Sequence, residues 1–165
     1  MRHLPILARC AYAAAASAAV AANNSFISFF NDSSAAQVLA LRDFGLDVQL
    51  SASIEGFVIA RQKIGANPVQ GSSVYTSQGS MPGQLLTGSV AANPAFSLFA
   101  SGNTFSPGWP HEFPIVVLAP GWSITAYATT QNAALILSFW WEWMFPAQLL
   151  NPDIGPEHID HARGY

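Results

Sequence analysis

Three regions differ in their pattern of hydrophobic and polar positions: an alanine-rich stretch, a body of short alternating runs and a tail punctuated by prolines. Residues 6–22 contain neither glycine nor proline, and alanine, the strongest helix former, dominates them. Pro5 precedes the stretch at a position that helices tolerate, and Asn23 follows it as a stop signal. We therefore expect an N-terminal helical segment, residues 1–24, whose helix over 6–22 packs against the body or a neighbour.

The same stretch has features of a secretory signal peptide, which stays open as the alternative. It starts with basic residues, continues with apolar ones and contains small-residue cleavage sites such as Ala19-Val20-Ala21. Arg9 interrupts the apolar part, and alanine stands where leucine is usual, so the helix is favoured. The run from Cys10 to Ala22 is shorter than the ~20 apolar residues that cross a bilayer, and we expect no membrane partner.

From residue 25 onward, short runs of β-type residues alternate with turn residues. The expected strands are Ser25–Phe30, Ala36–Phe44, Leu46–Leu50, Gly56–Arg61, Phe113–Leu118, Trp122–Thr129 and Asn132–Trp143. Residues 65–110 are rich in Gly, Ser, Asn and Pro and predict long loops with short strands. Strands of this length and spacing are typical of an antiparallel β-sandwich or jelly roll, here over residues 25–145.

The last of these runs, residues 132–143, is apolar on both faces. A strand with one wet face alternates, so both faces of this one must be covered. We expect the sandwich core on one side and the N-terminal helix or another subunit on the other. Residues 146–165 hold three prolines and predict an extended C-terminal arm that lies against a neighbouring subunit.

The charge content points to an assembly. Only 9% of the residues are charged, against roughly 25% in ordinary soluble proteins, and 51% are hydrophobic. No charged residue lies between Ile64 and His111, or between Phe113 and Trp141. A subunit that buries much surface against copies of itself is favoured over a monomer with an uncharged polar surface. The composition excludes intrinsic disorder, and one lysine with five scattered arginines argues against a nucleic-acid partner.

No constellation of catalytic residues is visible, so we expect no enzyme, cofactor or metal. The four histidines are His3, His111, His158 and His161, and no nucleophile elbow accompanies them. Glu157, His158, Asp160 and His161 are metal-ligand types but lack the spacing of a known zinc motif, so a solvated or inter-subunit tail is favoured. A hydrolase with its site in the 65–110 loops beside His111 stays open as a rival. Cys10 is expected to be buried and structural.

Three segments together resemble small β-sandwich structural proteins of tailed bacteriophage particles. These are the opening FISFFNDSSAAQVLALRDF, the turn region VVLAPGWSITAYATTQNAAL and the closing LSFWWEW. The matching residues are Asn31, Leu118, Pro120, Gly121, Ser123 and Trp141-Glu142, and the resemblance covers residues 25–45 and 113–143. It implies a virion protein that decorates or cements the head shell, is made in the host cytoplasm and has the major capsid protein, other virion proteins and its own copies as partners.

Subunit contacts are expected from the N-terminal helix, the aromatic end of the last strand and the arm. The expected interface residues are Ile6, Tyr12, Val20, Trp140, Trp141, Trp143, Phe145, Leu149 and Leu150. Two alternatives stay open besides the hydrolase: a secreted carbohydrate-binding β-sandwich module, for which the aromatic cluster would be the platform, and a phage fibre or tail component.

Overall fold

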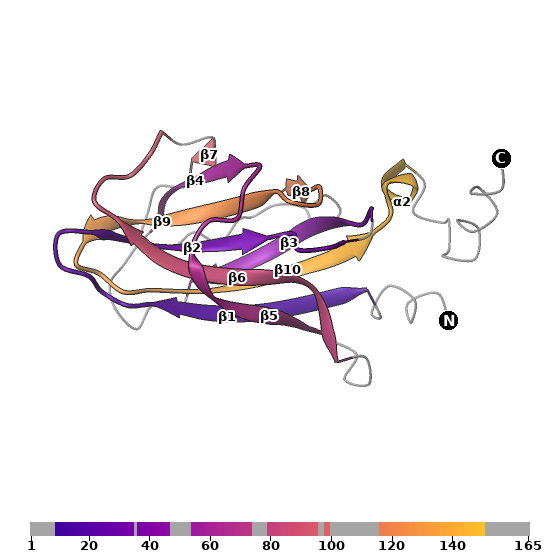
Figure 1. Ribbon diagram of the computed structural model, residues 1–165, viewed down its shortest axis with the longest axis horizontal. Coiled ribbons are helices and arrows are strands. Elements are labelled where there is room, and N and C mark those ends of the chain that lie inside the picture. The colour runs from indigo at the N-terminus through magenta and orange to yellow at the C-terminus, as the bar shows by residue number, and fades with distance from the viewer. Residues whose placement is uncertain are drawn as a thin grey trace.

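The structure, a computed structural model, describes residues 9–34, 36–46, 54–73, 79–95, 98–99 and 116–150, and Figure 1 shows their arrangement. These residues form one short helix, α2 (Pro146–Leu150), and ten strands. The strands are β1 (Cys10–Ser17), β2 (Asn24–Phe30), β3 (Val38–Leu46), β4 (Ile54–Ala60), β5 (Ala66–Ser73), β6 (Ser80–Val90), β7 (Leu98–Phe99), β8 (Val116–Leu118), β9 (Ser123–Gln131) and β10 (Leu135–Met144).

All strand pairs are antiparallel, and they join into one sheet in the order β7-β4-β9-β2-β6-β5-β1-β10-β3-β8. The sheet curls, because side chains from distant places in this order meet. Phe44 of β3 lies edge-on to Phe57 of β4, with ring centroids 5.1 Å apart, and Phe29 of β2 lies 4.6 Å from Trp141 of β10. The predicted all-β class is therefore confirmed.

The centre of the core is the ring of Trp141, which is 1% exposed. Its indole N–H donates a 2.8 Å hydrogen bond to the carbonyl oxygen of Pro82. Two glycines, Gly71 on β5 and Gly83 on β6, lie directly against the ring, where a Cβ atom at either position would collide with it. The β5–β6 hairpin can therefore approach β10 closely only because these positions lack side chains.

The helix predicted over residues 6–22 is wrong for the residues that the structure describes, since Cys10–Ser17 form strand β1. The strand pairs along its whole length with β10, from Cys10 opposite Glu142 to Ser17 opposite Leu135. Ala11, Ala13 and Ala15 face the core and are buried. Pairing and burial along eight residues outweigh the small helix preference of each alanine. Residues 1–8 lie outside the described part.

The structure corrects the loops predicted for residues 65–110. Residues 66–73 and 80–90 are strands β5 and β6, and β6 is eleven residues long. The glycines taken as loop signals have packing roles: Gly88, for example, lies against the ring of Phe26 and makes room for it. Gly45, which separates the expected strands Ala36–Phe44 and Leu46–Leu50, lies inside β3 opposite Ser138. The strand expected at Leu46–Leu50 lies outside the described residues after Leu46.

The other expected strands agree with the structure to within a few residues. Ser25–Phe30 lies in β2, Gly56–Arg61 overlaps β4, Phe113–Leu118 overlaps β8, Trp122–Thr129 overlaps β9 and Asn132–Trp143 overlaps β10. The expected turn at Pro120-Gly121 is also present, with Gly121 at a φ of 80°. The extended arm predicted over residues 146–165 is wrong for residues 146–150, which form the helix α2, and residues 151–165 lie outside the described part.

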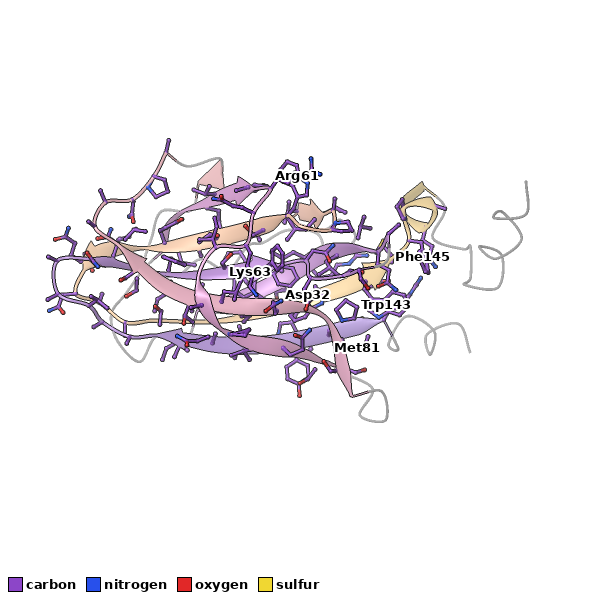
Figure 2. The ribbon with its side chains drawn as sticks, viewed as in Figure 1. Asp32, Arg61, Lys63, Met81, Trp143 and Phe145 are labelled. Atoms are coloured by element: carbon purple, nitrogen blue, oxygen red, sulfur yellow. The ribbon has the colours of Figure 1, made fainter. Side chains whose placement is uncertain are left out.

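The hairpin β5–β6 is tied to the end of β2 through Asp32 (Figure 2). The backbone N–H of Gly83 donates a 2.7 Å hydrogen bond to the Asp32 carboxylate. The side-chain amides of Gln70 and Gln84 each donate a 3.1 Å hydrogen bond to the same carboxylate. Nearby, the Lys63 ammonium lies 6.0 Å from the ring centroid of Phe30. The connection between β4 and β5 therefore passes over the outer side of β2.

Candidate interaction surface

Strands β1 and β10 present an outer face on the side away from the core. Alternate residues of β1 are exposed, and the register places them beside residues of β10 that face the same way. The six residues form three cross-strand pairs: Tyr12 with Trp140, Ala14 with Ser138, and Ala16 with Ile136. We call this set the β1/β10 face.

Tyr12 and Trp140 form a ridge at one end of this face. They are 44% and 46% exposed, and their rings stack with centroids 5.3 Å apart and an interplanar angle of 26°. A stacked aromatic pair holds both side chains in place. Ala14 and Ala16 continue the face beyond the ridge as exposed but small side chains, so a ridge adjoins a shallow floor. Exposed apolar side chains that cluster in this way are typical of sites that contact other molecules.

A charged cluster borders the ridge. Glu142 is 6% exposed, and the guanidinium groups of Arg9 and Arg42 lie 3.3 and 2.8 Å from its carboxylate oxygens. Arg42 reaches Glu142 because β3 bulges here: Trp140 pairs with Asp43 and Trp141 with Leu41. Glu142 therefore binds two guanidinium groups at once.

Two further groups lie beside this cluster. Cys10 pairs with Glu142 in the β1–β10 register. Burial raises the pKa of the Cys10 thiol, the Glu142 carboxylate raises it further, and the two arginines oppose these effects. Asp43 is exposed and lies opposite Trp140 on the side away from Tyr12. The ridge is therefore bordered by the exposed Asp43 and by the Arg9–Glu142–Arg42 cluster.

The opposite outer face, over β2 and β9, is covered. The rings of Phe26 and Tyr127 are buried against each other, with centroids 5.5 Å apart. Gly65, in the connection between β4 and β5, lies against Phe26 so closely that a Cβ atom would be 3.1 Å from the ring. Burial also raises the pKa of Tyr127. The chain therefore covers one outer face itself and leaves the ridge of the other exposed among the described residues.

The structure brings only two of the expected interface residues together on the β1/β10 face, Tyr12 and Trp140. Trp141 lies in the core, so it offers no surface to a partner. Trp143 is half-buried and packs edge-on against Phe145, with centroids 6.2 Å apart, beyond the charged cluster (Figure 2). Val20 is exposed in the connection between β1 and β2, away from the ridge. Ile6 and the side chains of Leu149 and Leu150 lie outside the described part.

Sequence reasoning missed the rest of this face and the carboxylate of Asp43 beside it. Ala14, Ala16, Ile136, Ser138 and Asp43 carry no chemical motif, and a run of alanines hides the two-residue alternation of a strand. The sequence signal for this face is the apolar character of both sides of residues 132–143.

The rival sites fall elsewhere in the chain. His111, His158 and His161 lie outside the described residues. Within residues 9–34, 36–46, 54–73, 79–95, 98–99 and 116–150, no three or more His, Cys, Asp or Glu side chains gather as they would around a metal ion. A search of the same residues finds no helix with the length and apolar character needed to span a bilayer. Comparison with family models, with curated proteins and with solved structures gives no match.

Proposed function

We propose that the protein is a structural component of a tailed-phage virion, a jelly-roll subunit that decorates or cements the capsid through contacts between subunits. The observation that carries the proposal is the strand order. In an eight-stranded jelly roll, the first, eighth, third and sixth strands form one sheet, and the second, seventh, fourth and fifth form the other. When the β5–β6 hairpin is set aside, the orders β1-β10-β3-β8 and β2-β9-β4-β7 correspond to these two sheets.

The hairpin accounts for the departure from a plain jelly roll. It is an insertion between the fourth and fifth strands, and it pairs with β1 on one side and β2 on the other. It therefore joins the two sheets along one side of the sandwich and protects two strands that would otherwise be edges. Jelly rolls serve as capsid and lectin domains, and the sequence resemblance favours the first of these.

The surface supports an assembling role. Within the described residues, the strands that remain at the edges of the sheet are β7 and β8, which are two and three residues long there. The β1/β10 face is larger and apolar, and its aromatic ridge has the residue types that dominate contact energies between proteins. Low overall charge lowers the cost of burying the rest of the surface.

A carbohydrate-binding module is the second candidate, and the exposure of Trp140 favours it. Sugars stack on open aromatic faces, however, and here the rings of Tyr12 and Trp140 stack on each other. The next residues along the face, Ala14 and Ala16, offer no hydrogen bonds from their side chains. A glycan that quenches Trp140 fluorescence at micromolar concentration would favour this candidate over the virion role.

The test is decoration of particles in vitro. Particles assembled without the chain are mixed with purified protein, and the bound amount is measured after sedimentation. We expect saturable binding, and we expect Trp140→Lys to reduce it at least tenfold, because the ridge is lost. Trp122→Lys is the matched control, since Trp122 is also exposed, at 37%, but lies outside the β1/β10 face. A wild-type chain that stays in the supernatant at every concentration contradicts the virion role.

A further inference from the structure

We propose that strand β1 exchanges between copies of this chain, so that β1 of one subunit occupies the place between β10 and β5 of its neighbour. Such an exchange links the subunits of the proposed assembly, so this inference rests on the proposed function and deepens it. Two features of the molecule support it: the slot in which β1 lies, and the connection of residues 18–23 that leads from β1 to β2.

The slot of β1 lies between two other strands of the sheet. β1 pairs with β10 along all eight of its residues, and with β5 at Ala11 and Tyr12. Withdrawing β1 leaves the backbone groups of β10 and β5 that face it without partners, so the slot binds a strand. The strand that fits its register and length is β1 itself, and a second copy carries an identical one.

Side-chain contacts fix the place of β1 in this slot. At one end the guanidinium of Arg9 lies 3.3 Å from the carboxylate of Glu142, and the ring of Tyr12 stacks on that of Trp140. At the other end the hydroxyl of Ser17 donates a 2.9 Å hydrogen bond to a backbone carbonyl of β6. In an exchanged pair the same contacts form between two chains instead of within one. The closed and exchanged forms therefore differ mainly in the connection.

The connection between β1 and β2 contains a strained turn. The backbone N–H of Asn23 donates a 3.1 Å hydrogen bond to the carbonyl oxygen of Val20, which closes a tight turn. Ala22, the third residue of this turn, has a φ of 59°. Glycine or asparagine usually occupies such a position, because a Cβ atom is unfavourable there. The closed form holds strain at Ala22, and an extended connection between two chains releases it.

The connection is also able to open and to reach a neighbour. Residues 18–22 are all exposed, and their side chains are four alanines and one valine. The hydroxyl of Ser25 lies 2.9 Å from the carbonyl oxygen of Ala18 and 2.6 Å from that of Ala133, so it keeps an acceptor when Ala18 moves away. Six extended residues span about 20 Å, roughly twice the distance between packed sheets.

Hinge strain and concentration decide between the two forms, because both keep the contacts of β1. A free chain at low concentration is expected to be closed, since exchange requires a second copy. Subunits that lie side by side on a particle have a high effective concentration, which favours exchange.

The experiment is disulfide cross-linking between β1 of one chain and β10 of another. Ala14 and Ser138 lie opposite each other on the β1/β10 face, and opposite residues have Cα atoms about 4.5–5.5 Å apart, which suits a disulfide. One full-length chain carries Ala14→Cys and another carries Ser138→Cys, both with Cys10→Ser. The two are refolded together over a series of concentrations with oxidised glutathione. We expect a disulfide between residue 14 of one chain and residue 138 of the other, identified by mass spectrometry.

Two controls define the cross-link. A chain with both Ala14→Cys and Ser138→Cys closes the bond within itself and shows that the two positions are close enough. Chains that are folded separately and then mixed give the background from contacts between outer faces, since β1 of each is already in place.

Substitutions of Ala22 are expected to shift the balance in opposite directions. Ala22→Gly relieves the closed turn and lowers the ratio of exchanged to closed chains roughly tenfold. Ala22→Pro fixes φ at about −65°, excludes the closed turn and raises the ratio. Asn67→Gly is the matched control: Asn67 is exposed and has a φ of 51°, but it lies in β5, and its substitution leaves the ratio unchanged.

Either of two results overturns the inference. One is the absence of the disulfide between chains at concentrations where the doubly substituted chain forms its own. The other is an equal cross-linked fraction with alanine, glycine and proline at residue 22. Neither result decides the proposed function, because decoration of particles is measured separately. A chain that decorates particles without exchanging β1 joins its neighbours as a closed subunit.

Discussion

At the scale of single residues, a buried carboxylate holds the charged border of the ridge together. Glu142 is nearly inaccessible to solvent and binds two guanidinium groups at once. Removing the carboxylate charge from such a cluster removes the ion pair that both guanidinium groups make with it.

We therefore expect Glu142→Gln to lower the free energy of unfolding by about 2–4 kcal/mol, measured by urea denaturation. This loss stays below the upper end of the usual cost of breaking a buried ion pair, because the side chain of Arg42 is 32% exposed and partly solvated. Asp43→Asn, at the exposed carboxylate nearby, is the control and stays within about 0.5 kcal/mol of the wild type. Equal effects of the two substitutions would show that the ion pairs of Glu142 contribute nothing.

A second residue-scale feature is the glycine against Trp141. Gly71→Ala places a methyl group against the indole ring, and we expect a loss of about 1–3 kcal/mol from overpacking in the same measurement. Ser72→Ala, at the next and exposed position of β5, stays within about 0.5 kcal/mol. A stable Gly71→Ala variant would mean that β5 does not lie against this ring.

At the scale of elements, β1 shows why sequence patterns predicted some strands and missed another. Residues 123–131 and 24–30 mix β-branched, aromatic and polar residues with clear alternation, and their strands were predicted. In Cys10–Ser17, alanine stands on both faces, so hydrophobicity carries no period and only helix propensity remains to be interpreted. What decides the structure is pairing with β10, a contact between residues more than a hundred positions apart.

This explanation gives a direct prediction for β1. Ala13→Leu inserts a large side chain into the core and is expected to cost about 1–3 kcal/mol of stability, measured by urea denaturation. Ala14→Leu, one residue along, points outward and is expected to change stability by less than about 0.5 kcal/mol. Comparable losses at the two positions would contradict the two-residue alternation of a strand.

The site was predictable only in part for a related reason. Trp140 and Trp141 are adjacent residues of the same type. Only the side of the sheet to which each side chain points makes Trp140 exposed and Trp141 buried in the core. The β3 bulge that brings Arg42 to Glu142 depends on register, which the sequence does not encode locally. The aromatic and charge-poor character of residues 132–143 did predict an apolar outer face, of which Trp140 is the exposed residue.

At the scale of the whole molecule, the two outer faces of the curled sheet are unequal. The chain covers Phe26 and Tyr127 with its own β4–β5 connection, whereas Tyr12 and Trp140 are left open among the residues described. In the proposed assembly, the open face would be directed at neighbouring subunits.

The C-terminal arm is expected to add a second tie at this scale. Truncation after Leu150 removes residues 151–165, and we expect unchanged urea denaturation but reduced binding to particles, because α2 and the sheet are retained. The control is the same chain with residues 151–165 replaced by a Gly/Ser linker of equal length. It shows whether particle binding depends on the sequence of the arm or only on its length. Unchanged particle binding by both variants would remove the arm from the assembly.

The central claim, that this chain is a structural part of a virion, is tested most directly by the composition of the particle. Particles are banded repeatedly on a density gradient, and the number of copies of this chain per copy of the major shell protein is measured by quantitative mass spectrometry. A structural subunit gives a fixed ratio that survives each round of banding. A ratio that falls towards zero with successive rounds would contradict the virion role.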